Sequence, residues 1–216
     1  MHSHSSAHGT PATSGKVIHW ARFYDAVAFL VSFGREKRMR RETVERAGVS
    51  PGQSVLDVGC GTGSLTLAAK TAAGSTGQVH GIDPSPEMID VSRRKAARAR
   101  ADIDFRVGVV EDLPFPDKSF DVVLSSLMLH HLPDDLKRKA FAEIARVLKP
   151  GGIFFAVDLA AGSHASLGRR LASHFMPKSQ DDLASLTPVL AEAGFRDVTT
   201  GHMKIRLLGY ISSLRV

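Results

Sequence analysis

The stretch that decides the fold is VLDVGCGTGSL, residues 55–65. It begins as an apolar run typical of a strand, passes through three alternating glycines and enters a segment of helical composition. Because Gly59, Gly61 and Gly63 lack a Cβ, backbone N–H groups and the start of the following helix can approach a ligand closely. The pattern therefore predicts a binding turn for a small molecule between a strand and a helix.

The glycine spacing and one carboxylate narrow the kind of ligand. A dinucleotide-binding turn follows Gly-x-Gly-x-x-Gly and directs its helix at a pyrophosphate, whereas this turn is Gly-x-Gly-x-Gly followed by Ser64. Asp57, two residues before the first glycine, would repel a phosphate and attract a cationic amino group. S-adenosylmethionine, an amino acid joined to a nucleoside, has the favoured character, and a nicotinamide-dependent oxidoreductase is disfavoured.

Length and composition indicate one globular domain of ordinary size. The chain has 216 residues, of which 43% are hydrophobic and 23% charged, which excludes neither an enzyme nor a binding module. The longest apolar run near the start, residues 26–31, is too short to span a bilayer. Since Cys60 is the single cysteine, no internal disulfide can form and a reducing cytoplasm is expected. A catalytic thiol there is disfavoured.

The positive charge is concentrated in two blocks, residues 35–41 and 93–100, within a net charge of +6. Acidic partners such as RNA or anionic lipid headgroups are one interpretation of these blocks. A solvated helix face is the other, and it is the one we favour, which makes nucleic acid a disfavoured partner.

Three regions are predicted along the chain. Residues 1–15 have the composition of a disordered tail, in which nothing would hold His2, His4 and His8 around a metal, and no other metal site is expected. Residues 16–50 are predicted to form an N-terminal helical lid, divided near Gly34. Residues 51–216 form the main domain, in which strand and helix patterns alternate as in a parallel sheet covered by helices on both faces.

Seven strands are predicted, at residues 54–58, 78–83, 103–107, 120–125, 152–158, 197–201 and 207–214. Too few residues join the last two for a crossover helix, so these two should pair antiparallel. Only this last pairing is expected to break the parallel pattern. Residues 149–152, Lys-Pro-Gly-Gly, are predicted to be a turn that ends a helix before the fifth strand, and Ser85 with Pro86 is predicted to start a helix.

Several motifs occur together in one order and spacing: residues 55–65, Gly81-Ile82-Asp83, residues 112–121, His130-His131-Leu132 and residues 148–152. With them the sequence resembles class I S-adenosylmethionine-dependent methyltransferases over roughly residues 52–158, and within that class the branch of ubiquinone and menaquinone C-methyltransferases. The resemblance implies an α/β, Rossmann-like three-layer sandwich with a seven-stranded, mostly parallel sheet and a C-terminal antiparallel strand. It also implies S-adenosyl-L-methionine as methyl donor, S-adenosyl-L-homocysteine as product, and a small, lipophilic methyl acceptor.

The resemblance places the cofactor on residues that match the family's motifs. Asp57 and the glycine turn would hold the methionine part, and Asp83 the ribose hydroxyls, although a helix-capping role for Asp83 is the alternative. Val109 departs from the family, where Asp or Asn usually binds the adenine amino group, so Glu111 or Asp112 substitutes or that contact is absent. The whole cofactor set is Tyr24, Asp57, Gly59, Cys60, Gly61, Thr62, Gly63, Asp83, Pro84, Met88, Val109, Val110, Glu111, Asp112 and Ser126. Tyr24 either belongs to a lid over the cofactor or serves aromatic packing.

Methyl transfer from a sulfonium needs mainly positioning and exclusion of water, so no elaborate catalytic triad is expected. An oxygen, nitrogen or acidic C–H acceptor would benefit from a base, and His130 or His131 follows the fourth strand at the right place. The alternative is that both histidines only form the entry to a helix.

The acceptor side is less defined. Residues 164–176 form an amphipathic segment that would cover a lipophilic substrate, rest on the inner face of a membrane or simply cover the core. The leading hypothesis is a methyltransferase acting on a quinone precursor, a phospholipid headgroup or a secondary metabolite. The alternative is a non-catalytic or RNA-associated S-adenosylmethionine-binding protein, and the oligomeric state is left open.

Overall fold

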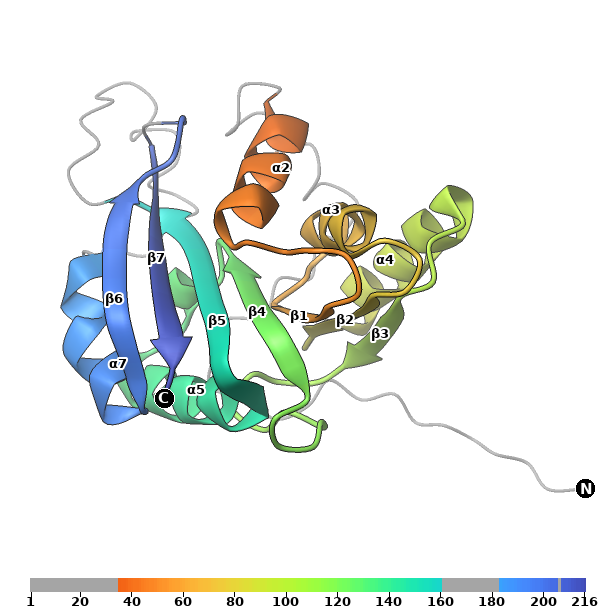
Figure 1. Ribbon diagram of the computed structural model, residues 1–216. Coiled ribbons are helices and arrows are strands. Elements are labelled where there is room, and N and C mark those ends of the chain that lie inside the picture. Colours follow the sequence, from red (N-terminus) through yellow and green to blue (C-terminus); the bar gives the residue numbers. More distant parts are fainter. Residues whose placement is uncertain (1–34, 161–182, 206) are drawn as a thin grey trace, which may run out of the picture.

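The computed structural model describes residues 35–160, 183–205 and 207–216, which form a three-layer α/β sandwich (Figure 1). In this part of the chain the sheet consists of β1 (Ser54–Val58), β2 (Gln78–Asp83), β3 (Asp104–Val107), β4 (Phe120–Ser126), β5 (Leu148–Leu159), β6 (Phe195–His202) and β7 (Leu208–Arg215). The strand order across the sheet is β3-β2-β1-β4-β5-β7-β6. The predicted Rossmann-like architecture is confirmed, and every predicted strand overlaps an observed one.

Helices cover both faces of the sheet because alternate strand residues point to opposite sides. The helices are α2 (Glu36–Arg46), α3 (Ser64–Ala73), α4 (Pro86–Ala99), α5 (Asp134–Val147) and α7 (Thr187–Glu192), with 3₁₀ turns η1 (Leu129–His131) and η2 (Leu183–Leu186). On one face α2 and α3 share a buried core with Val55 and Val122 of the strands. On the other, α5 and α7 bury side chains against Leu56, Val123 and Phe154. The alternation explains why neighbouring residues of one strand serve two different cores.

The C-terminal hairpin is arranged differently from the prediction. β7 lies between β5 and β6 and runs antiparallel to both of them. The expectation that only the last pairing breaks the parallel pattern is therefore wrong, since two pairings are antiparallel. The short connection after β6 turns the chain back, as predicted, but it returns β7 into the place beside β5 and leaves β6 at the edge.

The Lys-Pro-Gly-Gly motif at residues 149–152 lies inside β5 and not in a turn before it. Between β4 and β5 the register moves from Phe120 opposite Leu148 to Val122 opposite Ile153, so β5 carries extra residues there, as in a β-bulge. Gly151 has φ +76°, which glycine adopts without strain. The motif thus correctly indicates a break in regular pairing, but the strand begins earlier than predicted.

Ser85 begins one helix, and the first basic block lies in another. Ser85 caps α4, because its Oγ accepts the Met88 N–H at 3.3 Å and Pro86 opens the helix, as predicted. The basic half of the predicted N-terminal helices is α2. The tail at residues 1–15, Tyr24 and the amphipathic segment at residues 164–176 lie outside the described residues. Within them, the helices are all too short or too polar to cross a bilayer.

Candidate cofactor site at the carboxyl edge of the sheet

The strand order places a topological switch point between β1 and β4, and the region beyond the carboxyl ends of these two strands is called the crevice below. α3, which follows β1, and α5, which comes after β4, pack on opposite faces of the sheet. At such a topological switch point the connections diverge beyond the carboxyl ends of the two strands, and this is where open α/β sheets bind ligands. Asp57 lies near the end of β1 and Ser126 ends β4, so both lie at this switch point, and their binding of a cofactor stays a prediction.

The glycine turn packs closely against neighbouring side chains of the protein. Gly59, Gly61 and Gly63 all have positive φ values, of +68°, +53° and +78°, which favour glycine. A Cβ on Gly59 would lie 2.5 Å from Cγ of Met128, and one on Gly63 would lie 2.8 Å from Cβ of Ser92. The glycines are therefore required by close packing at two of the three positions, a reason that the sequence pattern does not reveal.

Backbone hydrogen bonds fix the turn to β2. The N–H groups of Gly59 and Cys60 both donate to the Ile82 carbonyl, at 2.9 and 3.0 Å. Cys60 is buried, and burial raises the pKa of its thiol well above the usual value. A catalytic thiolate at Cys60 is thus unfavourable, in agreement with the interpretation of this residue as part of the turn.

Asp83 braces the turn from the end of β2. Its Oδ2 accepts the Gly61 N–H and its Oδ1 accepts the Ser85 N–H, both at 2.9 Å. Burial raises its pKa to about 6, although these two N–H groups lower it. Pro84 is half-buried beside it, and Met88 is buried beneath, 2% exposed. One carboxylate therefore connects the glycine turn with the start of α4.

Asp57 is the most buried carboxylate of the crevice, at 1% exposure. Burial raises its pKa to about 7, while a hydrogen bond from Thr66 and the charge of Arg40 lower it. The Thr66 Oγ1 donates to Oδ2 at 2.6 Å, and Thr66 belongs to the first turn of α3. A buried carboxylate of this kind is unstable as an anion unless a cation approaches it, so the site fits a ligand with an ammonium group.

Arg40 of α2 is a residue of this site that the sequence analysis missed. It is 7% exposed, and its Nη1 donates to the Oγ of Ser126 at 2.6 Å. Glu36, one turn earlier on α2, lies 3.6 Å from its Nη2, whereas its buried Nε has no hydrogen-bond partner among the described residues. A guanidinium buried with an unused donor is costly, so the crevice also fits a ligand with a carboxylate.

Thr62, predicted to bind the cofactor, already has a protein partner. It is buried, and Lys95 of α4 donates from Nζ to its Oγ1 at 2.9 Å and to the Oγ of Ser64 at 3.2 Å. The second basic block thus contributes one cation to the outer side of the turn. This contact has no sequence signal, since 33 residues separate the partners.

The predicted adenine loop is folded as a tight turn after β3. Val109 and Asp112 form an isolated bridge, Val109 and Glu111 are half-buried and Asp112 is exposed. Val110, in contrast, belongs to the apolar core together with Leu113. Its side chain is therefore not available to the adenine ring, and only its backbone could contact adenine.

A network from α5 holds the end of this loop. Glu143 accepts the Leu113 N–H at 2.9 Å, and Arg146 donates to the carbonyls of Leu113 and Phe115 at 2.9 and 2.8 Å. The pKa of Glu143 is lowered chiefly by its hydrogen bond with Arg146. Because both residues lie on a helix packed against the sheet, the loop has a rigid support.

His130 and His131 are distinguished by the structure. His130 lies in η1, its Nδ1 is 2.6 Å from Oδ1 of Asp158, and its backbone N–H donates to Oδ2 of the same residue at 3.2 Å. Asp158, near the end of β5, is 3% exposed and was missed by the sequence analysis. The two histidine rings lie 4.0 Å apart. The buried carboxylate fixes the orientation of the His130 ring.

The similarity of this chain to known proteins agrees with the fold and the site. Residues 55–152 match the model of the family described as methyltransferase domain. Residues 55–152 are thus similar to a methyltransferase domain, and the fold around them is that of S-adenosylmethionine-dependent methyltransferases.

Relatives and solved structures are consistent with this class. The chain is 41% identical over 130 residues to the demethylmenaquinone methyltransferase of Halalkalibacterium halodurans, a match that covers 60% of this chain and 52% of that protein. The chain thus spans about half the length of the curated relatives it matches.

Two solved structures share the fold at low sequence identity. A SAM-dependent methyltransferase from Aquifex aeolicus superposes with a TM-score of 0.74 at 21% identity, over 89% of this chain and 98% of that one. Phosphoethanolamine N-methyltransferase 2 of Haemonchus contortus, solved in complex with S-adenosyl-L-methionine, has a TM-score of 0.68 at 18% identity, over 93% and 60%.

Proposed function

We propose that this protein transfers a methyl group from S-adenosylmethionine to a small, lipophilic acceptor. The observation that carries the proposal is the pair of carboxylates beside the glycine turn, the buried Asp57 and the half-buried Asp83, near the switch point of the sheet. The similarity to demethylmenaquinone methyltransferases supports a quinone-like acceptor. The matched region covers only part of those relatives, so the acceptor is inferred from the site and from this likeness together.

The residues present fit the cofactor group by group. Asp57 would bind the ammonium group, whose charge stabilises the buried carboxylate. Asp83 would accept the ribose hydroxyls with the lone pairs that Gly61 and Ser85 leave free. The turn and the half-buried Val109 would enclose the nucleoside. When bound, S-adenosylmethionine supplies a methyl group on a sulfonium that is a good leaving group.

Arg40 would complete the site by pairing with the carboxylate of the methionine part. Its unused Nε and its contact with Ser126 place a guanidinium next to the crevice in which Asp57 would hold the ammonium. A ligand that carries both charges matches both side chains. Since Arg40 lies on α2, this contact would also link the N-terminal lid to cofactor binding.

The Arg40→Ala variant should bind S-adenosylmethionine about 10- to 100-fold more weakly, because a hydrogen bond to a charged group contributes about 1.5–3 kcal/mol. Isothermal titration with the donor and with its decarboxylated analogue measures the effect. The variant should lose the preference of the wild type for the carboxylated form. Arg41→Ala, which removes an exposed guanidinium from the same helix, should leave that preference intact, and a preference retained in Arg40→Ala would refute this role.

His130 is the proposed base. Its Nδ1 faces Asp158, so the ring donates that proton to the carboxylate and presents the lone pair of Nε2. Nε2 would take the proton that the acceptor atom releases as the methyl group bonds to it, and the imidazolium formed would be stabilised by Asp158. His131, whose ring is tilted against that of His130, is proposed to assist only through packing.

The proposed reaction is tested by methyl transfer itself. The full chain is incubated with methyl-labelled S-adenosylmethionine and a short-chain demethylmenaquinone, reduced to the quinol, in detergent micelles. Label should appear in the quinone fraction and S-adenosylhomocysteine should form in equal amount. Parallel reactions with phosphoethanolamine test a headgroup acceptor. Donor binding without transfer to either compound would favour the alternative of a non-catalytic S-adenosylmethionine-binding protein.

A further inference from the structure

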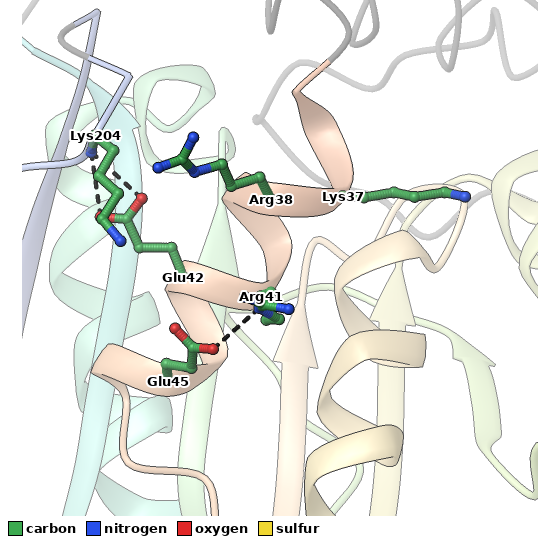
Figure 2. A pocket seen from close by; sticks show the side chains of 6 residues that line it. All are labelled: Lys37, Arg38, Arg41, Glu42, Glu45 and Lys204. Atoms are coloured by element: carbon green, nitrogen blue, oxygen red, sulfur yellow. Dashed lines mark hydrogen bonds and ion pairs between the residues drawn. The ribbon is translucent and has the colours of Figure 1, made fainter.

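A basic hollow of about 450 Å³ lies on the outer face of α2 (Figure 2). The six side chains that line it are Lys37, Arg38, Arg41, Glu42, Glu45 and Lys204. Lys204 comes from the connection between β6 and β7, so the hollow joins two segments far apart in the sequence. Four cations and two carboxylates meet there, and the balance of charge is positive.

Both carboxylates are already engaged by protein groups. Glu45 pairs with Arg41 at 3.1 Å. Glu42 accepts the Nε–H of Arg46 at 2.9 Å and the backbone N–H of Lys204 at 3.2 Å. In Figure 2, Arg38 and Lys204 extend over the same side of the hollow. Lys37, Arg38 and the ammonium of Lys204 have no carboxylate partner in the described segments and are available to an external anion.

The hollow lies on the outside of the helix that covers the cofactor crevice. One face of α2 buries Met39, Arg40 and Thr43, and Arg40 reaches Ser126 at the end of β4. The opposite face carries the exposed cations. Figure 1 shows α2 beside the carboxyl end of β4, the edge at which His130 also lies. A surface bound by these cations would therefore be close to the edge where the acceptor reacts.

We propose that this face of α2, together with Lys204, docks on the anionic headgroups of a lipid bilayer. The proposal rests on the proposed function, because a lipophilic acceptor is dissolved in the membrane and has to be reached there. Clustered Lys and Arg side chains are attracted to the negative surface of an anionic leaflet. None of the six described side chains that line the hollow is aromatic, whereas sites for single-stranded nucleic acid combine cations with aromatic stacking.

Vesicle co-sedimentation of the full chain tests the proposal. The wild type should bind phosphatidylcholine vesicles that contain about one third phosphatidylglycerol, should not bind pure phosphatidylcholine, and should dissociate as salt is added. Each cation near an anionic leaflet contributes about fivefold to binding. The triple variant Lys37→Glu, Arg38→Glu, Lys204→Glu should therefore lose binding by about a hundredfold or more.

A charge-matched control separates this surface from the overall positive charge. Arg94→Glu, Arg98→Glu, Lys139→Glu reverses three exposed cations on α4 and α5 and should keep most of the vesicle binding. The proposal is overturned if the control loses as much as the triple variant, if wild type binds neutral vesicles equally or neither kind, or if it retains a single-stranded RNA while ignoring vesicles.

Titration with S-adenosylmethionine in the absence of lipid separates the proposed docking surface from the proposed function. The triple variant should bind the donor as the wild type does, because its three exposed side chains are not part of the proposed cofactor site. If wild type binds anionic vesicles but no donor, the proposed function fails and the docking surface stands. If it binds the donor but no vesicles, the docking surface fails alone.

Discussion

Replacing Asp83 by alanine is expected to weaken S-adenosylmethionine binding by about a hundredfold or more, since two hydrogen bonds to a charged group contribute about 1.5–3 kcal/mol each. The change removes the proposed acceptor for the ribose. It also leaves the N–H groups of Gly61 and Ser85 without their partner, so the turn loses its brace. Isothermal titration measures the loss of affinity, and circular dichroism checks that the variant is folded.

The matched control is Asp90→Ala, which removes an exposed carboxylate from α4 and should leave binding unchanged. Asp83→Asn keeps an oxygen acceptor for one of the two N–H groups, so it should fall between alanine and wild type. The assignment would be contradicted by an Asp83→Ala variant that binds the donor within about threefold of wild type. Such a loss is smaller than the roughly fivefold change that 1 kcal/mol represents.

The two carboxylates also predict how donor affinity changes with pH. Both must be ionised to bind, and burial raises the pKa of Asp57 to about 7 and that of Asp83 to about 6. Affinity should therefore fall about fifteenfold from about pH 7.5 to about pH 6, of which Asp57 accounts for about eightfold and Asp83 for about twofold. Asp57→Asn should bind more weakly and retain only the twofold dependence. A wild-type affinity that does not change over this range would contradict the two carboxylates as ligands.

The stability of the unliganded protein should show the opposite dependence on pH and should decrease as the pH rises. Because the pKa values of both carboxyls are higher in the folded than in the unfolded chain, the folded state binds more protons between the ordinary value near 4 and about 7. The contribution of these groups to stability is therefore present at acidic pH and is lost as pH rises through their folded values. Donor binding, which favours the ionised forms, should compensate most strongly near neutral pH.

The second large effect is expected at His130. His130→Ala should lower kcat by about 10²- to 10⁴-fold, the usual contribution of a general base, while donor affinity stays the same. Asp158→Asn should also reduce kcat strongly, because it removes the charge that stabilises the imidazolium and no longer fixes the tautomer that presents the lone pair of Nε2.

His131→Ala provides the comparison, since its ring lies next to that of His130, whose Nδ1 makes the short contact with Asp158. Its kcat should stay within about tenfold of wild type, below the usual contribution of a general base. A larger loss of kcat in His131→Ala than in His130→Ala would reverse the assignment of the base.

Most of the fold follows from periodic patterns that a sequence displays directly. Buried parallel strands appear as short apolar runs, and the glycine turn marks where the first of them meets a helix. The position of β7 was not predictable in this way, because hairpin length predicts antiparallel pairing but not which strand the hairpin pairs with. The β5 bulge was missed since Pro and Gly mark irregular backbone without saying whether a strand continues through it.

The residues of the candidate site likewise divide into those that local sequence motifs predict and those that they do not. Asp57 and Asp83 lie in recognisable motifs near the ends of predicted strands, and the structure places Asp57 near the carboxyl end of β1 and Asp83 at that of β2, beside the glycine turn. Arg40 and Asp158 act through contacts across 86 and 28 residues, and no local pattern reports such pairs. Arg40 in particular lies in a block of basic residues, where a buried guanidinium cannot be told from the exposed ones before the helix is packed.

The most direct test of the account is the titration of the wild-type chain with S-adenosylmethionine, followed by the same titration with NAD. One donor molecule should bind per chain, with a dissociation constant between about 1 µM and 1 mM, as for ordinary enzyme substrates, and Asp57→Asn should bind it more weakly. NAD should not bind measurably. No heat with S-adenosylmethionine, or equal binding of NAD, would contradict the assignment of the crevice between β1 and β4 to the methyl donor.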